Sequence, residues 1–356
     1  MNSVSRCGNA EDRETEMRDR LTGDVAPVRS WKPPLWRGVN LKNMFRINTQ
    51  FADGFREELF CWLHDWGFNF ARLPLDYRFF MEGETLLEEG LRRLDDAVIY
   101  GRKHKIHIQI SLHLAPGFVI LPLPDEPRDL HCNPESLRKF IRLWRTFAER
   151  YAGIPNEELS FNPLNEPQGF STEQYVQVFG ETLLAIRQAD PERFVMLDGN
   201  HVASKPVPFF FDIKSTGQAF RGYTPHALSH YAAPYISQQP KGVPGWPCTP
   251  GAEDNPQDWI WEQPEVTLEK FAWVKDLDYP VMIGEFGCYN KTPHDVCLAW
   301  MEHCLKLWKE KGLSWAIWNL NGVFGFLDSE RDDVEYEDFQ GHKLDRKMLD
   351  LLQKYF

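Results

Sequence analysis

The strongest constraint on the fold is an alternation of short apolar segments with longer helical patterns, which runs through most of the chain. A strand followed by a helix and a second strand makes a βαβ unit, and repeated units build a parallel sheet. The eight expected strands, of which the sixth has the weakest pattern, are Leu35–Leu41, Phe68–Leu75, His107–Leu114, Leu159–Asn165, Phe194–Asp198, Gly222–His230, Val281–Glu285 and Ser314–Leu320. Helical patterns follow most of them, at Phe55–Trp66, Glu84–His104, Pro134–Tyr151, Thr172–Ala189, Glu265–Leu277, Asp295–Lys311 and Leu344–Phe356, with a short irregular one near Ser204–Lys214.

These strands are apolar on both alternating positions, as expected of a sheet that is covered on both faces. Eight repeats are the number that closes a (β/α)8 or TIM barrel, whose inside is filled by side chains and whose outside is covered by helices. The sequence therefore predicts an α/β protein with this barrel. A doubly wound open sheet, which needs fewer strands, is the alternative. A chain of 356 residues with 42% hydrophobic and 14% aromatic residues suffices for the core of one such barrel.

Two segments fall outside the repeats. Residues 1–30 are polar and highly charged, and we expect them to form a flexible leader, which leaves residues 31–356 for the barrel. The segment Ala232–Pro264, between the sixth strand and its helix, is rich in Pro, Gly and Trp and is too long for a simple connector. Its three tryptophans either line a binding cleft or form a small core of the loop itself: Trp246, Trp259 and Trp261.

Charge and cysteine content restrict the partners and the compartment. The net charge of -12 argues against nucleic acid as a main partner, because phosphate binding needs a basic face. No stretch approaches the roughly 20 apolar residues that cross a membrane. Seven cysteines without a C-x-x-C pair indicate buried thiols in a reducing compartment, and the first 30 residues lack the apolar core of a secretion signal. A cytoplasmic protein is expected, or a secreted one if its leader is missing from this sequence.

Polar and aromatic side chains stand at the ends of six expected strands, where a barrel of this kind carries its active site. They are Arg72, His113, Asn165, Glu166, His230, Tyr231, Glu285, Trp318 and Asn319. Any one of them alone is explained as well by a helix cap, a salt bridge or core packing. Together they would be costly to bury without mutual hydrogen bonds, and the set therefore indicates a catalytic site.

The two glutamates suggest the chemistry. Two carboxyl groups across a barrel mouth are what glycoside cleavage needs, because one gives a proton to the leaving oxygen and the other meets an oxocarbenium-like carbon. Arg72 near Glu285 would keep that carboxylate ionised, while Glu166, beside neutral Asn165 and apolar Leu164, would be held protonated. Glu285 is therefore the expected nucleophile and Glu166 the expected acid/base.

Asn165-Glu166-Pro167 after the fourth strand and Gly284-Glu285-Phe286-Gly287 after the seventh resemble the signatures of glycoside hydrolase family 5. Further segments are similar to the first three strands of that family: Arg37-Gly38-Val39-Asn40-Leu41, Asn69-Phe70-Ala71-Arg72-Leu73-Pro74 and Ser111-Leu112-His113-Leu114-Ala115-Pro116-Gly117. The resemblance runs from about Leu35 to the C-terminus. It implies a (β/α)8 barrel that acts on β-linked polysaccharides or oligosaccharides with retention of the anomeric configuration and without a cofactor.

The resemblance also implies roles for single residues. Arg72 would support the nucleophile, His113 and Asn165 would orient the sugar in the cleaved subsite, and Trp318 would form the aromatic floor beneath it. Trp315 is expected in the core instead.

The resemblance further implies a spacing and a sixth-strand contact. For a retaining pair, the carboxyl groups of Glu166 and Glu285 should lie about 5–5.5 Å apart. At the sixth strand the family pattern is His-x-Tyr, whereas this chain has Ser229-His230-Tyr231. His230 and Tyr231 are expected to contact the glutamates, with His226 and Tyr235 as alternatives.

The leading expectation is a cellulase-like, retaining endo-β-1,4-glucanase. A β-mannanase, a β-1,3-glucanase or an exo-acting β-glucosidase or β-mannosidase would use the same two glutamates on another substrate. A carbohydrate-binding barrel without activity would have lost a carboxylate, and both are present. A metal-dependent hydrolase would need a ligand cluster such as His-x-His at a strand end, and His107 and His113 stand too far apart for that motif, so no metal is expected.

Overall fold

A closed barrel of eight parallel strands forms the centre of the computed structural model, which describes residues 10–23, 25–27, 29–247 and 262–356. The strands follow one another around the barrel in sequence order, and the pairing of β2 with β5 completes the circle. They are β1 (Arg37–Asn40), β2 (Phe70–Asp76), β5 (His107–Ala115), β7 (Leu159–Asn162), β8 (Val195–Asp198), β9 (Thr216–Arg221), β10 (Val281–Glu285) and β11 (Ser314–Ile317). The predicted (β/α)8 barrel is confirmed.

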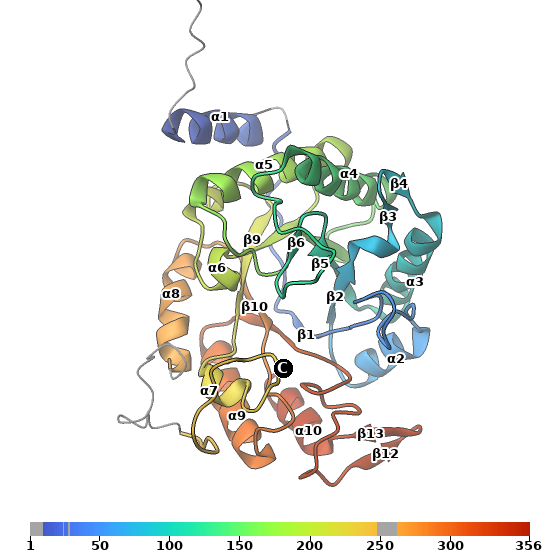
Figure 1. The fold of residues 1–356 in the computed structure, drawn as a ribbon, viewed down its shortest axis with the longest axis vertical. Helices are drawn as coiled ribbons and strands as arrows, with labels where there is room; N and C mark the ends of the chain where they lie inside the picture. Colours follow the sequence, from blue (N-terminus) through green and yellow to red (C-terminus); the bar gives the residue numbers. More distant parts are fainter. Residues whose placement is uncertain (1–9, 24, 28, 248–261) are drawn as a thin grey trace, which may run out of the picture.

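Helices surround the strands on the outside (Figure 1). The long ones are α2 (Glu57–Asp65), α3 (Glu88–His104), α4 (Pro134–Arg150), α5 (Thr172–Ala189), α8 (Pro264–Asp276), α9 (His294–Glu310) and α10 (Arg346–Lys354). Local sequence sets several of their starts. Asn133 caps α4 ahead of a proline in the first turn, and Ser171 and Gln174 form a capping box at α5. None of the described helices is long and apolar enough to span a membrane.

Short elements decorate the barrel. The strand β6 (Phe118–Val119) pairs antiparallel with β5, and two hairpins lie outside the main sheet. The hairpins are formed by β3 (Met81–Glu82) with β4 (Thr85–Leu86), and by β12 (Glu337–Phe339) with β13 (His342–Leu344). The remaining short helices are η1 (Tyr77–Phe79), α6 (Asn200–Ala203), η2 (Pro208–Phe210) and α7 (His226–Ser229).

The sixth barrel strand differs from the prediction. It was expected at Gly222–His230, but β9 lies one strand length earlier, and α7 occupies the end of the expected range. The apolar pattern misleads here because β9 buries polar side chains inside the protein. Gln218 is fully buried and bonds to both the backbone N–H and the carbonyl oxygen of Val207. A buried strand whose polar groups are satisfied in this way carries a weak hydrophobic signal.

An aromatic and aliphatic cluster closes the bottom of the barrel. Its buried members are Trp36, Phe70, Phe194, Met196, Ala219, Met282 and Ala316. His107 packs against two of these rings, and burial lowers the pKa of its imidazole to about 3, so the group is neutral. Trp315 is completely buried in the surrounding core, as expected. With its N-terminal end filled, the barrel can accept a ligand only at the C-terminal ends of the strands.

The described part of the leader forms the helix α1 (Ala10–Thr22), which packs on α5 (Figure 1). This part of the expected flexible leader is therefore helical and packed on the barrel, while residues 1–9 lie outside the described part. Met17 and Leu21 are four residues apart on one face of this polar helix and are both buried. On α5, Gly180 permits the close approach, since a Cβ there would lie 2.5 Å from the Met17 sulfur.

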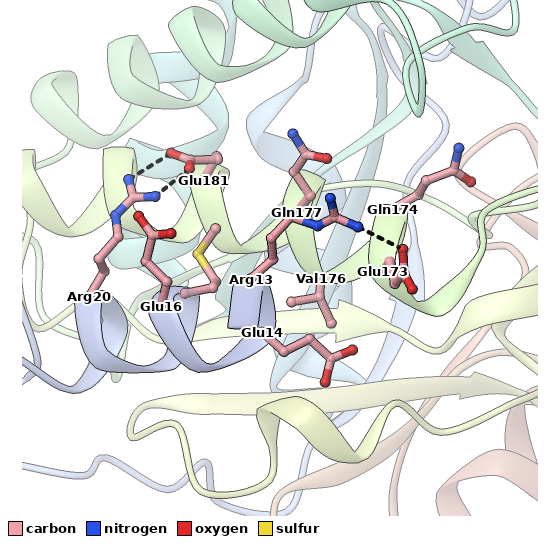
Figure 2. A pocket seen from close by; sticks show the side chains of 10 residues that line it. Arg13, Glu14, Glu16, Arg20, Glu173, Gln174, Val176, Gln177 and Glu181 are labelled. Atoms are coloured by element: carbon pink, nitrogen blue, oxygen red, sulfur yellow. Dashed lines mark hydrogen bonds and ion pairs between the residues drawn. The ribbon is translucent and has the colours of Figure 1, made fainter. Parts of the chain in front are cut away.

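Ion pairs between the two helices flank this apolar contact (Figure 2). Arg20 pairs with Glu181 at 2.6 Å and Arg13 with Glu173 at 3.5 Å, and all four side chains are about a third exposed or more. Exposed pairs of this kind contribute at most about 1 kcal/mol each. The docking of α1 therefore depends mainly on Met17 and Leu21.

Candidate active site

Glu166 and Glu285 lie at the same end of the barrel and share one polar network with Arg72 and Asn165. Glu285 is the last residue of β10, and Glu166 lies in the loop that follows β7. Their side chains are only 4% and 13% exposed. Four of the nine residues expected at the strand ends therefore meet in one network.

Arg72, on β2, holds the centre of this network and is itself 1% exposed. Its Nη1 donates to Oε1 of Glu285 at 2.8 Å and to Oδ1 of Asn40 at 3.0 Å. Its Nη2 donates to Oδ1 of Asn165 at 2.8 Å, and Nε and Nη2 both reach Oδ1 of Asn162. A guanidinium group with all its polar neighbours fixed in this way stabilises negative charge on Glu285 and holds its orientation.

The backbone of Glu166 adopts a left-handed conformation with φ of 49°, which is unusual for a residue other than glycine. The backbone N–H of Glu166 donates a hydrogen bond at 2.9 Å to the carboxylate of Asp198, which lies at the end of β8. Asp198 is fully buried and also accepts from the Asn162 amide at 3.0 Å. Asp198 is absent from the expected site residues, although its position at the end of an expected strand was a usable signal.

Arg221 is the second unexpected residue of the site, and it contacts both glutamates. Its Nε donates to Oε1 of Glu166 at 2.7 Å, and its Nη2 lies 3.2 Å from Oε1 of Glu285. The same Nη2 donates to Oδ1 of Asn165 at 2.9 Å and pairs with Asp198. Arg221 ends β9, so the misplaced sixth strand is the reason that the sequence did not point to it.

A tyrosine does contact Glu285 after the sixth strand, but it is Tyr223 and not Tyr231. The Tyr223 hydroxyl donates to Oε2 of Glu285 at 3.1 Å, and its ring lies edge-on against that of His230 at 4.9 Å. Within the described residues, neither His230 nor Tyr231 forms a hydrogen bond with either glutamate. At the end of the sixth barrel strand the chain therefore has Arg221-Gly222-Tyr223 and not Ser229-His230-Tyr231.

His113 and Trp318 form one wall of the mouth. Their rings are stacked with centroids 5.4 Å apart, and Phe45 from the loop after β1 packs against both. Burial, and then the positive charge of Arg72, lowers the pKa of His113 well below its ordinary value, so the imidazole is neutral. Its Nδ1 has no hydrogen-bond partner in the described part of the chain, and the same is true of Nδ2 of buried Asn165.

The pKa of Glu166 is raised to about 7. Burial is the main cause, Arg221 opposes it, and the negative charges of Glu285 and Asp198 add to it. A carboxyl group with this pKa is largely protonated in mildly acidic solution and still loses its proton near neutrality. Both forms of Glu166 are therefore accessible in the pH range in which proteins work.

A cavity of about 440 Å³ lies beside the Glu166 carboxyl group. Its wall includes the turn after β8, where His201, Val202 and Ala203 have φ of 52°, 61° and 52°. Three consecutive left-handed residues store strain that is typical of functional sites. On the other side α8 contributes Thr267 and Lys270. The Glu166 carboxyl group therefore faces a space that can hold part of a ligand.

The loop tryptophans do not line this mouth where they are described. Trp246 packs edge-on against His303 of α9, with ring centroids 5.2 Å apart, and contacts the main core. Trp259 and Trp261 lie outside the described residues. Among the residues that the structure describes, no three or more His, Cys, Asp or Glu side chains are grouped to hold a metal ion.

Known proteins resemble the chain over most of its length. The sequence matches the model of a family described as cellulase (glycosyl hydrolase family 5) over residues 32–323. It is similar to endoglucanase C of Acetivibrio thermocellus, with 23% identity over 297 residues that cover 76% of this chain and 85% of that protein. Cellodextrinase A of Ruminococcus flavefaciens is 24% identical over 258 residues, covering 70% of this chain and 74% of that protein.

A solved structure described as a glycoside hydrolase has the same barrel. It superimposes with a TM-score of 0.81 at 29% sequence identity, and the match covers 90% of this chain and 99% of that chain.

Proposed function

The chain belongs to glycosyl hydrolase family 5, the cellulase family, and on this premise we propose that it is a retaining endo-β-1,4-glucanase. In this proposal Glu285 is the nucleophile and Glu166 is the acid/base. The observation that carries it is that the carboxyl groups of these two residues contact one guanidinium group, that of Arg221, at the mouth of a family 5 barrel. A shared guanidinium group supports a closely spaced pair, as in a covalent double displacement, whereas inverting enzymes need a wider gap that admits water between the carboxyl groups.

In the first step, an oxygen of Glu285 forms a bond to the anomeric carbon while the glycosidic bond breaks. The proton of Glu166 goes to the leaving oxygen, so no alkoxide is released. Arg72 and Tyr223 orient the Glu285 carboxylate through hydrogen bonds to its two oxygens. Because this orientation exists before the sugar arrives, little reorganisation is needed at the moment of reaction.

In the second step, water attacks the anomeric carbon of the glycosyl-enzyme and releases Glu285 as a carboxylate. Glu166, now ionised, accepts the proton of that water. The pKa of about 7 suits this double duty, because the same group must donate a proton in one step and accept one in the next. Two inversions at the anomeric carbon give net retention.

We assign the unpaired polar atoms of the mouth to sugar recognition. Buried polar groups in native proteins nearly always have a partner, so Nδ1 of His113 and Nδ2 of Asn165 are suited to hydrogen bonds with sugar hydroxyls. Trp318 offers an indole face on which an apolar sugar face can stack. These three side chains are the proposed walls of the cleaved subsite.

Proton NMR of freshly released product tests the mechanism directly. Hydrolysis of a β-1,4-linked cello-oligosaccharide is expected to give the β-anomer first, followed by slow mutarotation to the equilibrium mixture. The α-anomer as first product would overturn the double displacement. In parallel, an endo mode is expected to lower the viscosity of a soluble cellulose derivative faster than it releases reducing ends.

A second candidate is an exo-acting enzyme on short β-linked oligosaccharides. The similarity to a cellodextrinase favours it. It keeps both glutamates in their proposed roles, and a slow viscosity decrease together with release of one uniform product would support it over the endo mode.

Replacing Tyr223 by phenylalanine tests the contact with the nucleophile. The change removes only the hydroxyl that donates to Oε2 of Glu285, and hydrogen bonds to charged groups are worth about 1.5–3 kcal/mol. We expect kcat to fall roughly 10- to 100-fold. Tyr231→Phe is the matched control and should retain kcat within about twofold, because a surface change away from such contacts has little effect. The opposite ranking of the two variants would restore Tyr231 to the site.

A further inference from the structure

The guanidinium group of Arg221 connects the two glutamates of the site. Within the described residues it is the one cation with a hydrogen bond or ion pair to Glu166, at 2.7 Å. Through Nη2 it also contacts Glu285 at 3.2 Å, the amide oxygen of Asn165 and the carboxylate of Asp198. The side chain is only 6% exposed, so the low dielectric of the site strengthens each of these interactions.

Two local features place this side chain. Arg221 and Glu285 are register partners on β9 and β10, after a shift of the pairing between Ile283 and Glu285. Such irregularities re-aim side chains next to active sites. Gly284, at that shift, leaves the space for the guanidinium, because a Cβ on it would lie 2.9 Å from Nη1 of Arg221.

The charges of the site balance in the free enzyme when one of its three carboxyl groups is protonated. The buried network contains three carboxyl groups, of Glu166, Asp198 and Glu285, and two guanidinium groups, of Arg72 and Arg221. With all three carboxylates ionised the sum is one negative charge, and with Glu166 protonated it is zero. Glycosylation of Glu285 removes one negative charge, so the sum returns to zero when Glu166 is ionised.

We infer that Arg221 is a positioning residue that links the charge on Glu285 to the protonation of Glu166. This inference rests on the proposed roles of the two glutamates. In the free enzyme Arg221 shares its positive charge between both carboxyl groups and Asp198. Once Glu285 is bound as an ester, Arg221 acts on Glu166 and Asp198 alone and stabilises the Glu166 carboxylate. The acid of the first step thus becomes the base of the second at the same external pH.

Other titratable groups face Glu166 and can affect its pKa. Asp198 and Glu285 raise the pKa of Glu166, and the hydroxyls of Tyr223 and Tyr235 lie near enough to feel its charge. The cavity beside it is also lined by His201, His226, His230, Glu262 and Lys270. Burial lowers the pKa of His226 to about 4 and that of His230 well below its ordinary value, so neither becomes charged in the range of the experiment.

The test compares the pH profiles of wild type, Arg221→Met and Arg221→Lys. In the wild type, kcat/KM for an oligosaccharide should fall as pH rises through about 7, where Glu166 loses the proton that it must donate. An opposite charge at this distance lowers a carboxyl pKa by about 1–3 units. The methionine variant should therefore keep this fall but move it upward by about 1–3 pH units.

The same variant should fail in the second step. With a dinitrophenyl glycoside, whose leaving group needs no proton, hydrolysis of the glycosyl-enzyme limits kcat. In Arg221→Met this step should require a higher pH, so that at pH near 6 the covalent intermediate accumulates and kcat falls by up to about tenfold for each unit by which the pKa of Glu166 rises. Arg221→Lys retains the charge and should leave the fall of kcat/KM near its wild-type pH. A merely structural role of Arg221 would shift neither profile.

Controls separate the outcomes. Arg193→Met removes another buried arginine, which pairs with Asp190 at 2.7 Å outside the mouth, and should lower stability without moving either profile. If Arg221→Met does not fold, Arg221→Gln removes the charge with a polar side chain instead. Unmoved profiles in a folded neutral variant would overturn the link. If wild-type enzyme gives no covalent adduct on Glu285, the proposed function itself fails.

Discussion

Replacing Glu285 by alanine is expected to reduce kcat by roughly 10⁴- to 10⁶-fold, the range seen when a catalytic nucleophile or its essential partner is removed. The variant should form no glycosyl-enzyme. In the wild type, a 2-deoxy-2-fluoro glycoside with a good leaving group should trap the intermediate, and mass spectrometry of peptides should find the adduct on Glu285. An adduct on any other residue would overturn the assignment.

External nucleophiles sharpen this first prediction. In Glu285→Ala, azide can enter from the face that the carboxylate has left, and a single displacement should then give the α-glycosyl azide. Glu126→Ala is the matched control, since Glu126 is a glutamate of low exposure that pairs with Arg78 at 3.2 Å outside the proposed site. It should keep kcat within a few-fold of wild type, whereas a loss as large as that of Glu285→Ala would point to a general effect on folding.

Replacing Glu166 by alanine is expected to divide substrates by leaving group. With sugar or other poor leaving groups, kcat/KM should fall by roughly 10²- to 10⁴-fold, the usual contribution of general acid catalysis. With a dinitrophenyl leaving group the first step should proceed, and the glycosyl-enzyme should accumulate because no base activates water. The fall of kcat/KM near pH 7 should disappear together with the group whose pKa is about 7.

Azide again gives the decisive readout for Glu166. Added to Glu166→Ala, it should attack the accumulated intermediate and release the β-glycosyl azide, the anomer opposite to that expected from Glu285→Ala. Equal loss of activity on both classes of substrate, or an α-azide from Glu166→Ala, would contradict the acid/base role. The pair of variants thus identifies each glutamate by the configuration of a product.

The sequence located those parts of the fold in which the buried face is apolar and the boundaries are marked. Val281–Glu285 and Thr172–Ala189 agree with β10 and α5 in both bounds, because a run of apolar residues ends at a glutamate in one and a serine cap precedes the other. The (β/α)8 barrel follows from such segments by simple repetition.

The predictions for β9 and α1 differ from the structure because hydrophobic patterns do not reveal buried polar residues or a helix with few apolar ones. Gln218 and Arg221 are buried on β9, where a hydrophobic pattern cannot report them, and the strand was placed too late. Arg221 and Tyr223 were then missing from the predicted site, because its residues were predicted from the ends of the expected strands. In α1, Met17 and Leu21 are the buried apolar residues among many charged ones. Two such residues are too few to give a periodic hydrophobic pattern.

The completeness of the polar network around Arg72 has a consequence for how such an enzyme changes over evolutionary time. Asn40, Asn162 and Asp198 are fully buried and bonded to one another or to the two arginines before any ligand is present. A mutation of any one of them leaves a buried partner unsatisfied, so the reacting end of the site tolerates little drift. Adaptation to a new glycan is left to the surrounding loops, such as the segment that carries Phe45. Loop exchange between relatives should therefore transfer substrate preference while the polar network around Arg72 stays unchanged.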